Sequence, residues 1–421
     1  MALDSKIPFL GRKYGCAIEL YFEGESTTTL SAEREKIHSK DQVSQEGFAV
    51  RTIKDGRMGF YSFELKSELE KAISTSLKLG KLQEKADYFF PGTRGVSKKH
   101  FDAKALNFGE NAMPKLQAMV DLQLGMKVTP VQNIVGASIT KKSIINTEGG
   151  STEGKSSNFF AISQCGYKET EADDSINCAK FNFEPMAAAA NAAKFAKDSA
   201  GAKKTGGGKR SVVFDIRAFQ QLLYLFMPFN FSGESLRKKL TKIGRGEVFS
   251  KTPISIVDDP GMALGSRPRE FDDEGFISKK RAIVKSGIVS DFLFDMQTCA
   301  KMKNETPGNG SRASYQSQPS IGATNISIDG GNYGDLIGEI GKGIYLNSFL
   351  TSGANHVTGD FSFPLMNANL IEKGEITTAI KGAMMKGNFF ELMNDAHFER
   401  KTEIYNGLKA GRMACELEII C

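Results

Sequence analysis

Short runs of β-branched and aromatic residues in the first half of the chain predict a β-sheet. Residues 15–22 (GCAIELYF) and 47–53 (GFAVRTI) have a composition that is typical of strands. A Lys-Asp-Gly turn at 54–56 leads from the second run into residues 57–61 (RMGFY). Because such turns join antiparallel neighbours, we expect a β-hairpin here.

Further along, residues 134–145 and 157–164 are expected to be long strands on either side of the turn at 146–150 (NTEGG). Apolar residues at helical spacing predict a helix that packs one face on the sheet: Leu65, Leu69, Ala72, Ile73 and Leu77. Strands and helices are mixed without strict alternation, which favours an α+β fold over a doubly wound parallel sheet.

Two more helices are predicted before the middle of the chain. The first contains Leu116, Met119 and Val120, and the second is the Ala-rich segment 186–196. The apolar residues of each recur on one helical face, so both helices are expected to pack against the sheet.

A glycine-rich segment at residues 200–209 (AGAKKTGGGK) is the strongest candidate for a linker. The pattern restarts after it with an apolar strand at 210–214 and an apolar helix at about 218–227. The length of 421 residues is also large for one domain. We therefore expect two domains, residues 1–205 and 206–421, each with a large mixed or antiparallel sheet.

Composition narrows the class of protein. Hydrophobic residues make up 40% of the chain and charged residues 25%, which is the balance of a soluble globular protein. Residues 1–15 contain no apolar stretch long enough for a signal peptide, and the densest apolar run, 222–229, is too short to span a bilayer. The sequence therefore predicts a cytoplasmic protein without a membrane segment.

The six cysteines are scattered along the chain and form no CxxC pair. Buried free thiols are therefore expected rather than a disulfide framework or a zinc knuckle. Cys415 and Cys421 lie on a terminal strand-like run and differ by six positions, an even number, so they are expected to share one face of that strand.

The net charge of +6 is mild for a chain of this size. Two basic clusters are present, Lys203, Lys204, Lys209 and Arg210, and then Arg237, Lys238, Lys239, Lys242 and Arg245. Basic clusters can bind phosphate backbones, but these lack the interleaved aromatic residues of a single-strand binder. Nucleic acid is therefore not expected as a direct partner.

The sequence holds no standard catalytic constellation. The four histidines have no metal-ligand spacing: His38, His100, His356 and His397. A GxSxG nucleophile motif is absent, and residues 205–211 (TGGGKRS) depart from a phosphate loop because Arg210 stands where Ser or Thr would hold magnesium. No catalytic residue and no metal ligand are therefore predicted in this chain.

Motifs along nearly the whole chain resemble those of the TldD/PmbA family, once named modulators of DNA gyrase. In the first half the resemblance rests on residues 47–60 (GFAVRTIKDGRMGF). In the second half the matching segments follow in the family's order: 271–275 (FDDEG), 283–292 (IVKSGIVSDF), 309–315 (NGSRASY), Pro319, 324–326 (TNI), 341–345 (GKGIY), 358–363 (TGDFSF), 372–376 (EKGEI) and 387–388 (GN). The resemblance implies two PmbA/TldD-like α+β domains.

The family that this chain resembles has two branches. TldD-type members carry HExxxH on the helix after the strand that opens the second domain, and a later cysteine completes the zinc site. Here that strand is 211–214, and the helix at 218–229 (AFQQLLYLFMPF) contains neither His nor Glu. Residues 358–376 also sit closer to the TldE/PmbA branch, although residues 309–315 resemble either branch. The missing ligands therefore place the chain with the TldE/PmbA branch.

The resemblance implies a heterodimeric metallopeptidase that cleaves unstructured peptides, in which a TldD-type partner supplies the zinc and the catalytic Glu. This chain would close the chamber and hold an extended peptide as an added strand at a sheet edge. The candidate peptide-groove residues lie in the Gly-rich loops: Asn309, Thr324, Asn325, Asp360 and Ser362. Two alternatives remain open, a regulatory binding protein acting on DNA gyrase or another DNA machine, and a self-sufficient hydrolase with a non-metal nucleophile.

Overall fold

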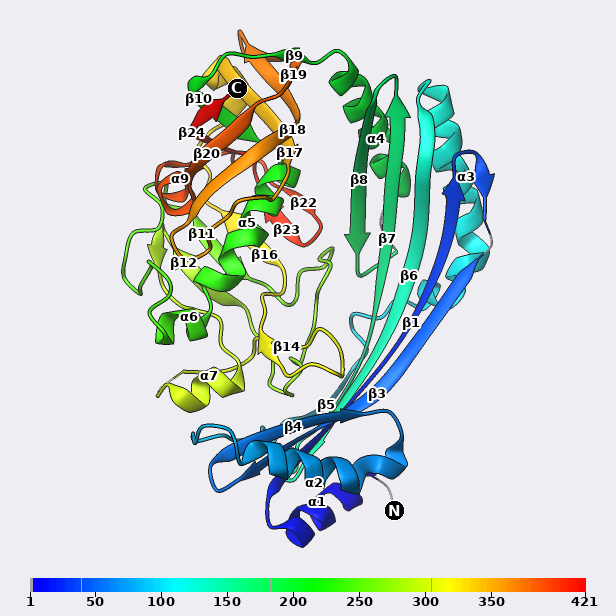
Figure 1. Ribbon diagram of the computed structural model, residues 1–421, viewed down its shortest axis with the longest axis vertical. Coiled ribbons are helices and arrows are strands. Elements are labelled where there is room, and N and C mark those ends of the chain that lie inside the picture. Colours follow the sequence, from blue (N-terminus) through cyan, green and yellow to red (C-terminus); the bar gives the residue numbers. More distant parts are fainter. Residues whose placement is uncertain (1–2, 39, 182–183, 304) are drawn as a thin grey trace.

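The structure is a computed structural model, and it describes residues 3–38, 40–181, 184–303 and 305–421 (Figure 1). The strands of its first half are β1 Ala17–Glu33, β2 Lys36–Ile37, β3 Asp41–Lys54, β4 Arg57–Phe63, β5 Arg94–Ser97, β6 Thr129–Asn146, β7 Ser151–Tyr167 and β8 Thr170–Cys178. They form one long, curved sheet with the order β4-β3-β1-β6-β7-β5, with β2 added to β1 and β8 to β7. Neighbouring strands are antiparallel, apart from the parallel pair β5 and β7.

Helices cover one face of this sheet: α1 Leu3–Tyr14, α2 Leu69–Gly80, α3 Phe108–Gly125 and α4 Pro185–Ala200, with short 3-10 turns at Lys66–Glu68 and Ala103–Ala105. Ile18 and Leu20 of β1 pack with α1 and α2, whereas Leu30 packs with α3. Because side chains alternate along a strand, the odd-numbered residues of β1 point to the opposite face. That face is turned toward the second half of the chain (Figure 1).

A second sheet is built from β9 Lys203–Lys204, β10 Gly208–Phe214, β17 Lys342–Phe349, β18 Asp360–Glu372, β19 Glu375–Lys381, β20 Met384–Asn388, β21 His397–Phe398 and β24 Met413–Ile420. Its order is β17-β10-β24-β20-β18-β19-β9, with β21 on β24. In addition, β17 pairs with β18, which closes five of these strands into a ring.

A third sheet has the order β13-β12-β11-β16-β23-β22. Its strands are β11 Ser255–Asp258, β12 Arg281–Lys285, β13 Ile288–Val289, β16 Ile326–Asp329, β22 Glu403–Tyr405 and β23 Leu408–Ala410, and a separate hairpin joins β14 Gly310–Ser311 to β15 Ser320–Ile321. The helices of this half are α5 Ile216–Asn230, α6 Gly233–Arg237, α7 Met296–Lys301, α8 Leu336–Ile340 and α9 Phe389–Asp395.

Helix α5 is the centre of the main core. Asp215 caps it by accepting the backbone N–H of Arg217. Phe219, Leu222 and Phe226 are fully buried and belong to the same hydrophobic cluster as residues of the second and third sheets. A helix that packs against two sheets must be apolar around most of its circumference, which explains why apolar residues dominate this segment.

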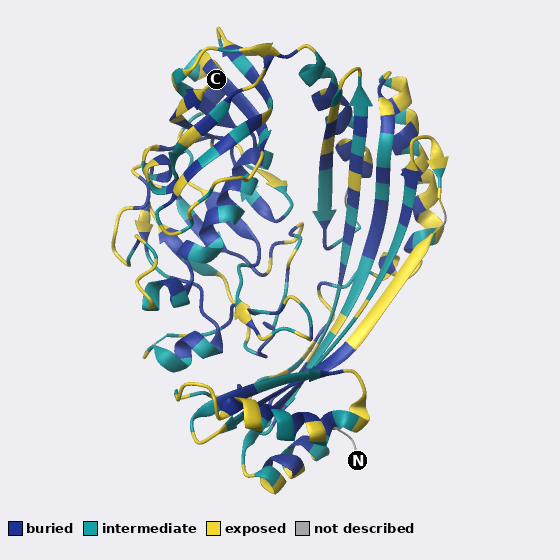
Figure 2. Cartoon of the chain, viewed as in Figure 1, coloured by how far each residue is buried: buried dark blue, intermediate teal, exposed yellow. Residues whose placement is uncertain are grey.

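The predicted α+β class is confirmed, and so is the hairpin around the turn at 54–56. The predicted strands at 15–22 and 47–53 were too short, because β1 and β3 continue through polar residues. Figure 2 shows why the predicted strand at 47–53 missed the first part of β3. Its residues 41–46 are exposed and lie beyond the part that pairs with β4, so no apolar pattern marks them. Helix α1 was not predicted.

The carboxyl-terminal cysteines and the linker segment differ from what the sequence predicted. Cys415 is buried in β24, but the strand ends at Ile420 and Cys421 is exposed, so the prediction that they share a strand face was wrong. In the linker segment 200–209, β9 pairs with β19 and so adds to the second sheet.

Among the described residues, no helix is long and apolar enough to cross a membrane.

Candidate functional site

A pocket of about 690 Å³ lies between the curved sheet and the loops of the second half of the chain. Its first wall is the face of β1, β6 and β7 that carries no helices. Its second wall is formed by residues 266–273, 311–313 and 320–324. The cavity is large enough for several residues of a peptide or for one small molecule.

The sheet wall of the pocket is polar because alternate residues of β6 and β7 point into it. Ser138, Thr140 and Lys142 of β6 line the pocket, and the β7 residues opposite them include Asn158 and Ser156. On the opposite face of β6, Val135 and Ala137 belong to the apolar cluster under α3, and Ile139 packs against it. Because successive side chains point to opposite faces of the sheet, one face forms a hydrophobic core and the other a wall of hydroxyl and amide groups.

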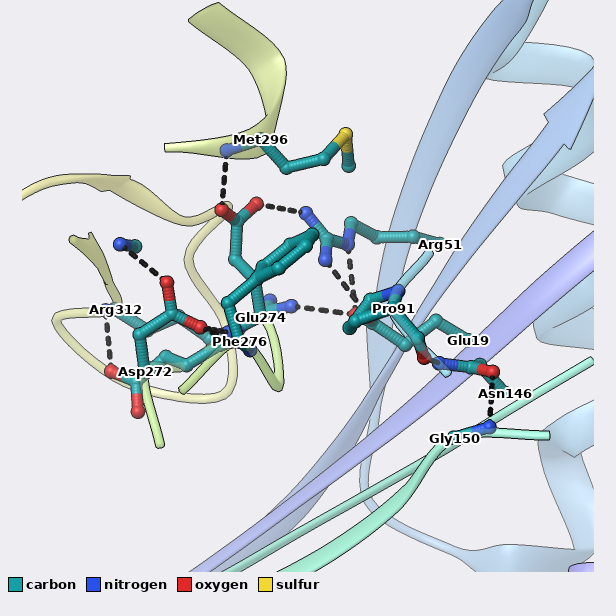
Figure 3. A network of polar contacts seen from close by, with 12 residues as sticks. Glu19, Arg51, Pro91, Asn146, Gly150, Asp272, Glu274, Phe276, Met296 and Arg312 are labelled. Atoms are coloured by element: carbon teal, nitrogen blue, oxygen red, sulfur yellow. Dashed lines mark hydrogen bonds and ion pairs between the residues drawn. The ribbon is translucent and has the colours of Figure 1, made fainter. Parts of the chain in front are cut away.

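A buried network of charges joins the curved sheet to the facing loops of the second half (Figure 3). Arg51 of β3 donates to both carboxylate oxygens of Glu19 on β1, at 2.8 and 2.6 Å, and to Glu274 of the facing loop at 2.5 Å. Arg312 also donates to Glu19, at 3.2 Å. The side chains of all four residues are 1% exposed or less. These contacts fix the loop at 271–276 against the sheet.

Burial and the opposite charge of the partner shift the pKa values of Arg51 and Glu274 in opposite directions. Burial lowers the pKa of Arg51, but Glu19 and Glu274 outweigh that effect, so the net shift of its pKa is upward. Burial raises the pKa of Glu274 despite the attraction of Arg51, and the nearby Asp272 raises it further. A buried charge network of this kind specifies one arrangement of its partners, because each unpaired charge would be costly.

The acidic-glycine turn at 271–275 is the element that carries this network. Asp272 accepts the backbone N–H groups of Glu274, Phe276 and Gly310, at 3.0, 2.9 and 2.9 Å. Gly275 has a φ of +83°, a conformation that a side chain would strain. The Asp, Glu and Gly of the motif therefore shape a loop and connect it to the sheet.

The next residue of the turn, Asp273, accepts from Lys142 of β6 at 2.8 Å and from the backbone of Arg312 at 2.8 Å. Lys142 is 34% exposed at the side chain, and it lines the pocket. This contact supplies a second connection between the loop and the sheet wall, next to the open part of the cavity.

The structure brings three of the five candidate groove residues together around Asp258 at the end of β11. Asn309 donates to one oxygen of Asp258 at 2.7 Å, and Thr324 donates to the other through its backbone N–H at 2.6 Å and its hydroxyl at 2.7 Å. Asn325 is fully buried and accepts the backbone N–H of Arg267 at 3.0 Å. Thr324 lines the pocket, whereas Asn325 supports the loop behind it.

The other two candidates lie elsewhere. Asp360 and Ser362 are at the start of β18, where Asp360 is exposed and accepts the side-chain amide of Asn388 at 2.8 Å. Neither belongs to the residues that line the pocket between the curved sheet and the second half of the chain. A peptide-binding role of the five residues stays a prediction. Sequence reasoning did not single out Glu19, Arg51, Glu274 and Arg312, although a charged residue inside an apolar strand run is a signal of a buried ion pair.

The residues present do not fit a zinc site. The sequence of α5, IRAFQQLLYLFMPFN, offers no His, Cys, Asp or Glu. The histidines are far apart: His38 is exposed, His100 lies in the pocket wall, His356 packs against Phe226, and His397 packs against a tyrosine ring. Within the described ranges, no three His, Cys, Asp or Glu side chains are grouped so that they could hold a metal ion.

The fold and the pocket together define an α+β protein whose two halves enclose a polar cavity. Residues 18–80 match the family model of the PmbA/TldA metallopeptidase domain 1, and residues 207–416 match that of the PmbA/TldA metallopeptidase C-terminal domain. The chain therefore belongs to the PmbA/TldD family of metallopeptidase-like proteins.

Individual relatives agree with this membership. An uncharacterized protein of Methanocaldococcus jannaschii is 26% identical over 400 residues, which cover 93% of each chain. A metalloprotease TldD homolog of Haemophilus influenzae is 34% identical over 150 residues, which cover 35% of this chain and 31% of that protein.

Solved structures show the same fold. TldE from Thermococcus kodakarensis superposes with a TM-score of 0.86 at 21% identity and full coverage of both chains, 100% each. A protein from Thermotoga maritima, proposed to be a modulator of a DNA gyrase, gives a TM-score of 0.86 at 19% identity and covers 99% of each chain. At these identities the likeness establishes the fold.

Proposed function

We propose that this chain is the TldE/PmbA-type subunit of a heterodimeric zinc metallopeptidase that cleaves unstructured peptides. The zinc and the catalytic Glu would come from a TldD-type partner subunit. This chain would contribute a wall of the chamber and contacts to the substrate peptide.

The observation that carries the proposal is the composition of α5. In a TldD-type subunit the corresponding helix is expected to present HExxxH, and a catalytic zinc needs several such ligands with one position free for water. Here α5 instead buries apolar side chains in the core, and the hydroxyl of Tyr224 donates to the backbone oxygen of Gly407 at 3.1 Å. A PmbA/TldD-type fold whose helix lacks zinc ligands is expected for a subunit that does not itself carry out catalysis.

The shape and polarity of the pocket also support the proposal. A wall of hydroxyl and amide groups can hydrogen-bond to a peptide main chain without demanding particular side chains. Binding of this kind suits substrates that are extended and varied in sequence. The name of the similar Thermococcus kodakarensis protein, TldE, agrees with the branch proposed here.

The test is reconstitution with the TldD-type protein of the same organism. We expect the two chains to co-purify, and we expect an unstructured peptide such as casein fragments to be cleaved by the mixture and not by this chain alone. The matched control replaces the HExxxH Glu of the partner with Gln, which should abolish cleavage without preventing assembly. Stoichiometric zinc in the lone chain, together with chelator-sensitive cleavage by it, would contradict the proposal.

The same preparation distinguishes the proposed function from the main alternative. A regulatory binding protein of DNA gyrase or another DNA machine would bind gyrase or DNA without the TldD-type partner, and DNA binding would weaken steeply as salt is raised. A stable complex of that kind, with no cleavage by the reconstituted pair, would favour the alternative.

A further inference from the structure

Three lysines, Lys98, Lys155 and Lys141, form a row across neighbouring strands of the curved sheet. Lys141 of β6 and Lys155 of β7 are directly opposite one another in the strand register. Lys98 follows Ser97, the last residue of β5, whose partner on β7 is Gly154, so Lys98 continues the row beside Lys155. Because adjacent strands lie about 4.8 Å apart, the lysine row extends over roughly 10 Å.

The lysine row is on the helix-bearing face of the sheet. Val135 and Ala137 of β6 belong to the apolar cluster under α3, and Lys141 follows the same alternation. Its neighbour Lys142 instead lines the pocket on the opposite face. Lys155 is near the sheet edge and borders the pocket as well. The lysine row therefore lies outside the proposed peptide chamber, with Lys155 at its margin.

The loop after β5 holds the lysine row in place. Nζ of Lys155 lies 3.7 Å from the centroid of the Phe101 ring, which restricts this half-buried ammonium group. Nζ of Lys180 donates to the backbone oxygens of Lys99 and Phe101, at 2.9 and 3.0 Å, and so fixes the loop that carries Lys98. Charged groups that are already positioned lose less conformational freedom when a ligand binds.

No carboxylate neutralises the lysine row. Within the part of the chain that the structure describes, none of its three lysines forms an ion pair. Asp102 of the neighbouring loop accepts the backbone N–H groups of Lys104 and Phe181 instead, at 3.0 and 2.9 Å. Glu153, two positions before Lys155 on β7, is exposed and does not pair with it.

Repulsion within the lysine row lowers the pKa of Lys155. Burial has the largest effect on this pKa, and the charges of Lys141 and Lys98 lower it further. Like charges directly opposite one another on neighbouring strands destabilise a sheet. An anion bound across the lysine row would remove this repulsion.

The composition of the lysine row favours one class of anion. Planar carboxylates are matched by the planar fork of arginine, whereas lysine binds phosphate as a point charge. Three ammonium groups along one line suit an anion whose negative charge repeats along its length. The face of the Phe101 ring beside the row is occupied by the Lys155 ammonium, so a nucleic-acid base has no place to stack there.

We propose that Lys98, Lys141 and Lys155 bind a short chain of phosphate groups, either free polyphosphate or the phosphate chain of a nucleotide. This site does not rest on the proposed peptidase function, because it needs neither the partner subunit nor a peptide. An anion that binds only the folded state stabilises it, so an occupied lysine row should make the chain more stable.

Calorimetric titration of the full-length chain with tripolyphosphate at low salt tests the inference. We expect Lys155→Gln to weaken binding about tenfold, and glutamine at all three positions of the lysine row to weaken it about a hundredfold or more. The matched control replaces Lys203, Lys204 and Lys381 by glutamine. These three are exposed, and the last two are directly opposite one another in β9 and β19. The control loses the same charge and should bind like the wild type.

Other anions identify the source and the class of the ligand. ATP that binds as tightly as tripolyphosphate assigns the site to nucleotide phosphates as well, whereas weaker binding of ATP assigns it to free polyphosphate. Citrate that binds as tightly as tripolyphosphate overturns the inference, since it would indicate attraction to any anion. A short single-stranded oligonucleotide that binds more tightly, and loses its binding in the triple variant, would assign the lysine row to nucleic acid and overturn the inference too.

A measurement on the unaltered protein covers the case in which a variant does not fold. Brief acetylation of the wild type, followed by mass spectrometry, reports which lysines are accessible. Saturating tripolyphosphate should protect Lys98, Lys141 and Lys155 from acetylation and leave Lys203 and Lys204 unprotected. Equal protection of both groups, protection of neither, or equal loss of tripolyphosphate binding in the two triple variants overturns the inference.

Discussion

Arg217 at the start of α5 reaches Asp174 on β8, and its Nε lies 3.2 Å from the Oδ1 of that carboxylate. Asp174 also accepts the hydroxyl of Tyr405 at 3.0 Å. The Arg217 and Asp174 side chains are 22% and 5% exposed. The contact therefore joins the outer strand of the curved sheet to the central helix of the second half, at the opposite end of the interface from the Arg51 network.

Removing this connection should destabilise the whole chain. For Asp174→Ala we expect the free energy of unfolding to fall by about 1.5–3 kcal/mol, the range for hydrogen bonds to charged groups, because Arg217 and Tyr405 lose a shared partner. Urea unfolding followed by circular dichroism measures it. The matched control is Asp395→Ala, which removes an ion pair with Lys251 whose side chains are 61% and 70% exposed. This control should change the free energy by less than about 0.5 kcal/mol.

The Arg51 network should make stability depend on pH. Burial raises the pKa of Glu274 in the folded chain from 4.5 to about 8. The folded state therefore holds this proton more tightly than the unfolded state, and the stability that it contributes is present at low pH and lost as the pH rises through that range. Relative to Glu274→Gln, which does not titrate here, the wild type should lose stability between pH 4.5 and 8. An identical pH profile for both proteins would rule out this role of Glu274.

The candidate groove residues should separate into two groups. Asn325 is fully buried, and its side chain accepts from the backbone of Arg267 and donates to that of Asp259. Asn325→Ala should therefore lower the free energy of unfolding by about 1–3 kcal/mol. Asp360→Ala, at an exposed position, should leave the melting temperature unchanged. If Asp360→Ala nevertheless weakens cleavage by the reconstituted pair, Asp360 acts on the peptide; if it does not, its role is confined to its contact with Asn388.

Limited proteolysis should test the boundary expected near residue 205. Lys203 and Lys204 are exposed in the short strand β9, and the glycines at 206 and 207 that follow are exposed as well. We expect trypsin to cut here first and to release two fragments that separate on a denaturing gel. First cleavage within β6 or β7 would count against a boundary at this place.

The local elements could be predicted from sequence because their signals are local. The turn at 54–56 and the apolar spacing of α2 depend on neighbouring residues, and both were correct in kind. Helix α1 was missed because only part of its length packs on the sheet: Ile7 and Leu10 are buried, whereas Phe9 is 48% exposed. Two buried positions are too few to set a periodic signal.

The site could be predicted only in part, because its residues come from distant segments. Glu19 and Arg51 each interrupt an apolar strand run, and the strand register places them opposite one another. Charged residues in such runs signal a buried pair, but no local pattern names Glu274 or Arg312 as their partners. Likewise, Asn309 and Thr324 were selected from glycine-rich loops, and their convergence on Asp258 depends on how β11 is placed.

The hydrogen bond between Arg312 and Glu19 spans 293 positions of the chain. During synthesis from the amino terminus, Glu19 and Arg51 therefore leave the ribosome long before the loop that will enclose them. The nascent curved sheet must keep these charges hydrated until most of the second half has been made, and contacts so distant in sequence form slowly. The first half is accordingly expected to remain incompletely docked, and accessible to chaperones and proteases, until translation is nearly finished.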